Sequence, residues 1–435
     1  MNRLTAAIFL NLLVILALAA CASTGSQNES GIPDYRERVS TRGDDEVSVS
    51  ISVLSAGESR DVYGVNLAKK NIQPVWIEVT NSGRSDFWLI STGLDPNFFP
   101  ASEAADAFAS GSRGGLAPGL EQRFEALAFR NPVPAGKTVS GFVLTNLQKG
   151  VKMVQLDLFA SGRFKSFSFL ATVPGFRSDY KARRVFEEAI YPPGEIVDYD
   201  DEAGLREALE SLPCCVTNED ASRNGDPLNL VVIGGVEEAF PALVRRGWHP
   251  TEQTWTGSVL EMIDSALSGE RYPYAPVSPL YLYGRPQDLA LQKARDNIHQ
   301  RNHMRLWLSP LRFRGQPVWA GQISRDIGTR LTIHSPYLTT HKIDPDVDEA
   351  RTALLEDMAY SQSLVKLGLV KGVGEADPDS ARENLTGDPY YTDGFRGVLI
   401  FTARPTALTE IVFLPWEFRS GGYIERIHNR KQDTQ

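Results

Sequence analysis

Residues 275–351 read APVSPLYLYGRPQDLALQKARDNIHQRNHMRLWLSPLRFRGQPVWAGQISRDIGTRLTIHSPYLTTHKIDPDVDEAR and are the part of the chain around which its C-terminal fold is organised. They contain four of the six histidines and a dense Asp/His cluster. From His303 to Leu308 polar and apolar residues alternate, which predicts a β-strand with one face in the core. Its apolar face should carry Met304, Leu306 and Leu308. The opposite face should line a cleft with His303, Arg305 and Trp307.

Outward from this stretch, the C-terminal half mixes helical and strand patterns. An apolar run at 228–233 is followed by Gly234-Gly235 and a helical pattern, and further helices are expected at 201–211, 256–268 and 346–362. No regular strand–helix–strand repeat is present, so we expect an α+β domain over residues 201–420. A Pro- and Gly-rich linker should precede it at 176–200, and a polar tail should follow at 421–435.

The N-terminal half has a different pattern. Val47, Val49, Ile51 and Val53 alternate with serines, which indicates a half-buried strand. Similar runs follow at 75–81, 87–91, 140–146, 151–160 and 164–173, and a helical insertion is expected at 101–130. Short strands separated by Pro and Gly predict an antiparallel β-sandwich over residues 47–175. The passage 132–142 resembles an immunoglobulin-like module of other envelope lipoproteins, so we expect an Ig-like sandwich.

The first residues resemble a bacterial lipoprotein signal peptide. Arg3 is basic, residues 6–18 are almost wholly apolar, and Leu18-Ala19-Ala20-Cys21 looks like a lipobox. The resemblance implies removal of residues 1–20 and lipidation, including a palmitate-type acyl chain, at Cys21. Ser23 rather than Asp stands two residues after Cys21, which by the sorting pattern of such lipoproteins indicates the outer membrane, facing the periplasm. Residues 21–46, rich in Ser, Gly, Asn and Asp, are expected to be a flexible tether.

Composition limits the function classes. The net charge is -9, which argues against a nucleic-acid-binding protein because phosphate contacts need a basic face. Cys214 and Cys215 are neighbours, and a disulfide between neighbours is strained, so we expect two partly buried thiols. A redox or metal role would need a CxxC spacing, which is absent.

Several polar segments of 275–351 are candidates for ligand binding. A guanidinium beside a carboxylate and an amide can hold a carboxylate or phosphate ligand. We expect such groups to converge on an anionic ligand, although each Arg–Asp pair could instead only fix a turn. The candidate residues are Arg285, Gln287, Asp288, His303, Arg305, Arg325, Asp326 and His341.

The cluster at 341–348 also suggests a divalent metal site. Its candidate ligands are His341, Asp344 and Asp346, because imidazole and carboxylate suit Zn²⁺, Mn²⁺ or Mg²⁺. An EF-hand is not supported, because Glu349 stands where that loop needs Gly and Leu355 where it needs Glu. The alternative reading is that Asp346 and its neighbours cap a helix. No HExxH or GxSxG motif is present, so protease or serine hydrolase chemistry of those types has no motif behind it.

The C-terminal half resembles the LssY-like C-terminal domain family from Pro227 to about Thr402. The segments that carry the resemblance are 226–231, 276–288, 303–307, 325–328, 341–348 and 387–394. The family has no established activity. Its name derives from a locus linked with type I secretion, and some members look fused to membrane segments of the phosphatidic-acid phosphatase type. The resemblance therefore implies an envelope setting and lipid or phosphate ligands.

Two functional hypotheses follow. In the first, a membrane-anchored envelope lipoprotein uses its LssY-like domain to bind an envelope protein partner or an anionic ligand, in secretion or envelope maintenance. In the second, the domain is a metal-assisted, phosphoesterase-like hydrolase that uses Asp344, Asp346, His303 and His341.

Overall fold

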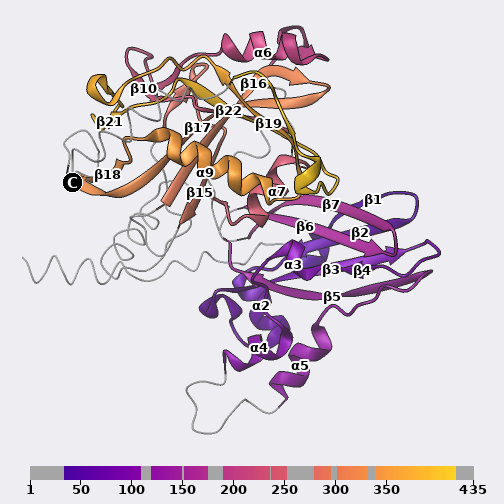
Figure 1. Cartoon of the computed structure of the whole chain (residues 1–435). Helices are drawn as coiled ribbons and strands as arrows, with labels where there is room; N and C mark the ends of the chain where they lie inside the picture. The colour runs from indigo at the N-terminus through magenta and orange to yellow at the C-terminus, as the bar shows by residue number, and fades with distance from the viewer. Residues whose placement is uncertain are drawn as a thin grey trace, which may run out of the picture.

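The computed structural model describes residues 34–108, 119–148, 151–174, 190–235, 237–251, 279–294, 301–331 and 339–417. These residues form two β-rich lobes that lie against each other (Figure 1). The expected helix at 256–268, the signal peptide, Cys21 and the tail 421–435 lie outside the described residues. Within the described parts, no helix combines the length and apolar character that a membrane crossing requires.

The N-terminal lobe consists of two antiparallel sheets that share one core. The first has the order β1 (Ser40–Gly43), β2 (Val47–Val53), β3 (Ile72–Asn81), β5 (Lys137–Asn146), and the second the order β4 (Trp88–Leu89), β6 (Val151–Ala160), β7 (Arg163–Thr172). The alternation in β2 acts as predicted, because its valines and Ile51 are buried while Ser48 and Ser50 are partly exposed. The buried valines and Ile51 pack against Val154, Leu156 and Leu158 of β6.

The strand order agrees only in part with an immunoglobulin domain. Such a domain places strands A, B, E and D in one sheet and C, F and G in the other. Here β4-β6-β7 follows the C-F-G order, but the larger sheet takes three strands before β4 and one after it. Two facing sheets are therefore present, whereas the Ig-like assignment is not established.

This lobe begins before Val47, inside the expected tether. Tyr35, in the turn of 3₁₀ helix η1 (Tyr35–Glu37), is buried against Trp76 and Phe142, and β1 pairs with β2 along its whole length. Four short helices then cover the outer side of the larger sheet, and α3 (Ser91–Leu94) instead packs beside β6. The four are α2 (Ala56–Tyr63), η2 (Leu67–Lys70), α4 (Ala101–Asp106) and α5 (Leu120–Leu127). The last two confirm the helical insertion predicted at 101–130.

The C-terminal lobe is built on a ten-stranded mixed sheet. Its main path is β12 (His249–Pro250), β15 (Leu289–Ala294), β16 (Arg301–Phe313), β17 (Gln316–Leu331), β11 (Leu230–Ile233), β22 (Phe395–Phe401), β19 (Leu364–Lys371) and β23 (Val412–Phe413). β18 (Thr339–Ile343) pairs with β17, and β8 (Val197–Tyr199) pairs with β16. The chain has thus joined this sheet by Val197, within the segment expected to be a linker.

Helices cover both faces of this sheet. α7 (Ala239–Arg245) and α9 (Val347–Ala359) pack on one face, where Leu230, Leu306 and Leu399 meet Leu243 and Leu354. α6 (Glu202–Glu210) packs on the other face through Leu205 and Leu209. The three helices expected near 201–211, after Gly235 and from Asp346 are all present. Because residues 230–233 alternate between the two cores, both faces of β11 are buried.

Smaller elements close the ends of the lobe. β10 (Asn224–Pro227), β9 (Cys215–Thr217), β13 (Tyr281–Leu282) and β14 (Arg285–Pro286) form a second sheet, and β20 (Arg382–Glu383) pairs with β21 (Pro389–Tyr390). Three 3₁₀ turns are η4 (Pro193–Glu195), η5 (Pro378–Ser380) and η6 (Leu408–Glu410).

Cys214 and Cys215 differ from the expectation of two thiols, because a disulfide joins them where the chain enters β9. The expectation rested on the short distance between neighbouring Cα atoms, which is 3.8 Å here. That spacing lies below the usual range for disulfides, yet the bond spans it.

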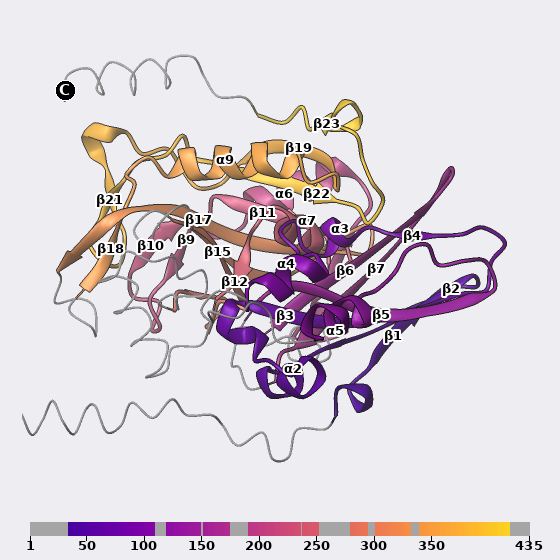
Figure 2. The same cartoon turned by 90° about the horizontal axis from the view of Figure 1, so that it is seen from below.

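The two lobes meet along the outer face of β6 (Figure 2). Met153 of β6 belongs to the core that contains α7. Further along the same face, Asp157 accepts a 3.4 Å hydrogen bond from Nη1 of Arg245 in α7.

Candidate functional site

The residues predicted around Arg285 form a turn whose polar groups hydrogen-bond to other groups of the protein. The Arg285 guanidinium donates to both carboxylate oxygens of Asp288 at 3.0 and 2.8 Å and to the Tyr191 hydroxyl at 3.0 Å. Asp288 also accepts from the Leu308 amide, and Gln287 accepts from the Leu280 amide. These contacts tie β14 to β16, so the groups of Arg285, Gln287 and Asp288 are committed to protein partners.

The predicted alternation in β16 is confirmed. Met304, Leu306 and Leu308 lie in the core beneath α7 and α9, and Trp307 lies in a different core with Ala320. The face that carries His303 is buried rather than open, since His303 is only 5% exposed.

His303 pairs with Asp326 on the neighbouring strand. Its Nε2 lies 2.5 Å from Oδ2 of Asp326. Burial lowers the pKa of His303 to about 4, and the nearby Asp326 carboxylate only partly opposes that effect. His303 is therefore neutral at pH 7 and donates its Nε2 proton to Asp326.

Arg301, which the sequence reasoning missed, shares this carboxylate. Its Nε donates to Asp326 Oδ2 at 3.2 Å, and its Nη1 donates to Gln292 of β15 at 2.9 Å. Both Arg301 and Asp326 are almost fully buried. Three neighbouring strands thus place the Asp326 carboxyl group between a guanidinium and a neutral imidazole.

Arg305 lies on the same face of β16, two residues further along. It donates to Gln322 of β17 at 3.0 Å, and Gln322 donates to Ser324. Burial raises the pKa of the nearby Asp226 carboxyl, and the positive charge of Arg305 partly offsets this. Of the predicted residues, the sheet therefore gathers His303, Arg305 and Asp326 in one buried polar row.

Arg325 points away from that row. It forms ion pairs with Asp344, just after β18, and with Glu349 in the first turn of α9, the latter at 2.8 Å. Its Nε is buried and has no hydrogen-bond partner within the described residues. Arg325 and Asp326 are sequence neighbours, so the alternation of β17 places their side chains on opposite faces.

The predicted metal ligands are not assembled in the described part of the chain. His341 pairs through its backbone with Thr329, but its side chain lies outside the described residues. Asp344 is engaged by Arg325. No group of three or more His, Cys, Asp or Glu able to hold a metal occurs among the residues that are described. The metal site stays a prediction.

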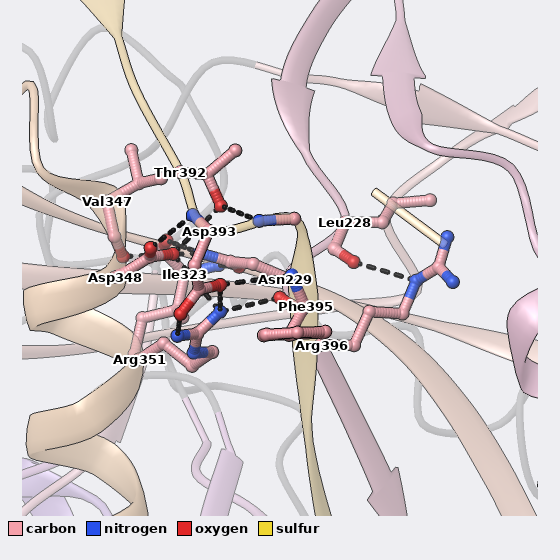
Figure 3. Close-up of polar contacts among 11 residues, drawn as sticks. Leu228, Asn229, Ile323, Val347, Asp348, Arg351, Thr392, Asp393, Phe395 and Arg396 are labelled. Atoms are coloured by element: carbon pink, nitrogen blue, oxygen red, sulfur yellow. Dashed lines mark hydrogen bonds and ion pairs between the residues drawn. The ribbon is translucent and has the colours of Figure 1, made fainter. Parts of the chain in front are cut away.

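The first turn of α9 makes a different contact from the cap we expected. Asp346 stands at the N-cap position without a side-chain capping bond. Asp348 instead accepts from the Thr392 hydroxyl at 2.9 Å and the Asp393 amide at 2.7 Å (Figure 3). This carboxylate ties α9 to the turn that precedes β22.

Arg351 completes that buried network. It is fully buried and donates two parallel bonds to Asp393, at 2.8 and 2.7 Å, and a third to the Phe395 carbonyl (Figure 3). Arg396 lies nearby and donates to six backbone carbonyls, three of them in α6 and the residues just after it. Burial lowers the pKa of Arg396 to about 10. Both arginines hold elements together and leave little room for a ligand.

A cavity of about 500 Å³ lies where α9 meets the edge of the sheet. Its lining combines apolar groups with three cationic residues. The lining residues are Trp248, Lys293, Arg301, Asn302, Arg325, Asp326, Ile327, Ala353, Leu354, Glu356, Asp357 and Tyr360. Two candidates from the sequence, Arg325 and Asp326, are among them, and Asp326 also contacts His303 of the buried polar row.

The charges of the cavity are held in place by carboxylates of α9 and by Asp326. Lys293 donates to Asp357 at 2.7 Å, and Asp357 also accepts from Arg246 and from the Trp248 indole. Trp248 and Leu354 are buried at the base, while Tyr360 and Ile327 are exposed at the rim. Volume, apolar walls and a few fixed polar groups are typical of small-molecule sites. The sequence did not indicate Lys293 and Asp357 as site residues, because they meet only when β15 lies beside α9.

A comparison with family models matches residues 206–395 to the family described as LssY C-terminus. No curated protein matches the chain. Every residue that lines the cavity beside α9 lies within the matched segment. The second lobe is therefore an LssY-like C-terminal domain.

Proposed function

We propose that this protein is an envelope lipoprotein whose LssY-like domain binds a small amphipathic anion in the cavity beside α9. The observation that carries the proposal is the combination of Lys293, Arg301 and Arg325 with the indole of Trp248 and the side chain of Leu354. Cationic groups suit a phosphate or carboxylate head, and apolar walls suit an attached hydrocarbon.

The lining favours an anion over a cation for a specific reason. Lys293 and Arg325 have more N–H donors than their carboxylate partners use, and Nε of Arg325 is buried without a partner in the described residues. A bound anion would satisfy such donors. The carboxylates Asp326 and Asp357 already accept from Arg301 and from Lys293, Arg246 and Trp248.

The envelope location rests on the N-terminal sequence. Residues 1–20 have the order of a lipoprotein signal peptide, and Cys21 would carry the acyl chains. We propose anchoring in the outer membrane, facing the periplasm. An amphipathic anion such as a lipid fragment is a ligand class that fits this setting.

Calorimetric titration of the purified chain with butyl, hexyl and octyl phosphate tests the binding proposal. We expect affinity to rise with alkyl length, because each buried methylene contributes about 0.8 kcal/mol. Lys293→Met and Arg325→Gln should each weaken octyl phosphate binding by about tenfold, as loss of about 1.4 kcal/mol implies. Lys366→Met is the control, because Lys366 pairs with Glu202 on the far face of the sheet. Absence of binding to the wild-type chain, or equal affinity in all variants, would contradict the proposal.

A further inference from the structure

Three aromatic side chains form an exposed row across the smaller sheet of the N-terminal lobe. Trp88 of β4 is directly opposite Phe159 of β6, and Phe159 is directly opposite Phe164 of β7. They are 50%, 45% and 39% exposed. Cβ atoms of directly opposed residues are about 5 Å apart, so the three rings make one continuous strip. Exposed apolar strips of this kind mark binding surfaces.

The row continues the surface that joins the two lobes. Residues 153, 155, 157 and 159 of β6 share one face, because side chains alternate along a strand. Met153 is buried against the α7 side, and Asp157 pairs with Arg245, whereas Phe159 is open. One end of the face is thus covered by the C-terminal lobe, and the aromatic row begins where this cover ends.

A cavity of about 350 Å³ lies at that boundary. Phe164 lines it, which connects it to the aromatic row. Its polar lining comes from both lobes and consists of Thr92, Asp157, Arg245, Gln362 and Ser363. Asp157 is the anion and Arg245 the cation of this lining, so its formal charges cancel.

Two features of the lining fit a bound molecule. Nε of Arg245 is buried and has no hydrogen-bond partner in the part of the chain that is described. Gln362 has an exposed side chain and a positive φ of 61°. Such a backbone conformation is unfavourable for a non-glycine residue and is concentrated at functional sites.

We propose that the aromatic row and the adjoining cavity bind a neutral saccharide chain. Sugar rings present C–H faces that stack on aromatic rings, and their hydroxyls both donate and accept hydrogen bonds. The Arg245–Asp157 pair, Thr92 and Gln362 supply donors and acceptors of both kinds without net charge. An anionic membrane surface would require free cations, but Arg163 and Lys165 beside the row pair with Glu46 and Asp44.

Tetramers of β-1,4-linked glucose and of β-1,4-linked N-acetylglucosamine are the probes, titrated calorimetrically into the full chain. We expect at least one tetramer to bind, and Trp88→Ala and Phe159→Ala each to weaken it by about tenfold, the equivalent of about 1.4 kcal/mol. Both side chains are exposed, so their loss should leave the fold intact. Phe413→Ala is the matched control, because Phe413 is an exposed phenylalanine on β23 of the other lobe, and it should bind like the wild type.

Three outcomes would overturn the saccharide site. They are no binding of either tetramer, unchanged affinity in both aromatic variants, or an equal loss in Phe413→Ala. Phosphatidylcholine vesicles are the second probe. Vesicle binding that Trp88→Ala abolishes would assign the row to a membrane and overturn the saccharide site as well. The alkyl phosphates act at the other cavity, so failure of one proposal is distinguishable from failure of the other.

Discussion

Nε2 of His303 lies 2.5 Å from Oδ2 of Asp326, between two central strands of the C-terminal lobe. Arg301 donates to the same oxygen, and burial keeps the imidazole neutral by lowering the pKa of His303. This contact joins the buried polar row to the cavity beside α9, because Asp326 and Arg301 belong to both.

The His303 pair predicts a pH dependence of stability. The pKa of His303 is about 4 in the folded chain, against an ordinary value of about 6.5 when unfolded. Between these values the unfolded chain binds more protons, so this contribution is fully present above pH 6.5 and is lost as the pH falls towards 4. It amounts to about 3 kcal/mol at most. Urea unfolding from pH 4 to 7.5 should show a steeper acid loss in the wild type than in His303→Gln. Parallel curves would contradict the assignment.

The buried pair of Arg351 and Asp393 should be essential to folding. Removing one partner leaves a charge buried without compensation, which costs about 3–5 kcal/mol. We therefore expect Arg351→Met to lower the free energy of unfolding by that amount, or to prevent folding. Glu349→Gln, which removes only a partly exposed partner of Arg325 in the same helix, should cost about 1 kcal/mol or less. Chemical denaturation of both variants measures the difference, and equal costs would refute it.

A comparison of Gly394 with Gly284 distinguishes the cost of a close backbone contact from the cost of a left-handed backbone conformation. Its φ is 84°, and a Cβ there would lie 2.7 Å from the Glu375 amide nitrogen. Gly284 has a φ of 72° with open space around it. Both alanine variants lose the freedom of glycine, at a cost of about 1 kcal/mol. Gly394→Ala should show a lower melting temperature than Gly284→Ala, because the backbone must also shift. The same melting temperature for both would mean that the contact has no energetic consequence.

The membrane anchor is tested by lipid labelling. Cells that express the wild-type chain and a Cys21→Ser variant are grown with a radiolabelled or clickable palmitate. We expect label only in the wild type, because the lipidated thiol is absent from the variant. A Cys214→Ser variant is the control and should be labelled normally. Equal label in Cys21→Ser would contradict the anchor.

Local patterns predicted much of the fold. The alternation at Val47–Val53 gave β2, and that at His303–Leu308 gave β16 with the correct apolar face. The helix expected at 201–211 begins at Glu202, where Asp201 caps it through its side chain. These features depend on neighbours in sequence, so a single chain reveals them. The early strand β1 and the membership of β8 in the large sheet were missed, because short polar strands are defined by their partners.

The candidate site was harder to predict because it depends on register. Asp326 was expected to bind a ligand, but Arg301 and Lys293 reach the cavity only because β15, β16 and β17 align as they do. Arg325 and Asp326 were both predicted to bind one anionic ligand, yet their side chains lie on opposite faces of one strand. Arg351 and Asp393 are 42 residues apart, so no local pattern in the sequence links them. Charge pairs across a sheet leave no periodic signal in the sequence.

The central claim is that the cavity between α9 and the sheet edge is a binding site for an amphipathic anion. A crystal structure of the full chain with octyl phosphate tests it most directly. We predict the phosphate beside Lys293 and Arg325 and the alkyl chain against Trp248 and Leu354. An empty cavity at a ligand concentration well above the calorimetric Kd, with octyl phosphate bound elsewhere, would contradict it.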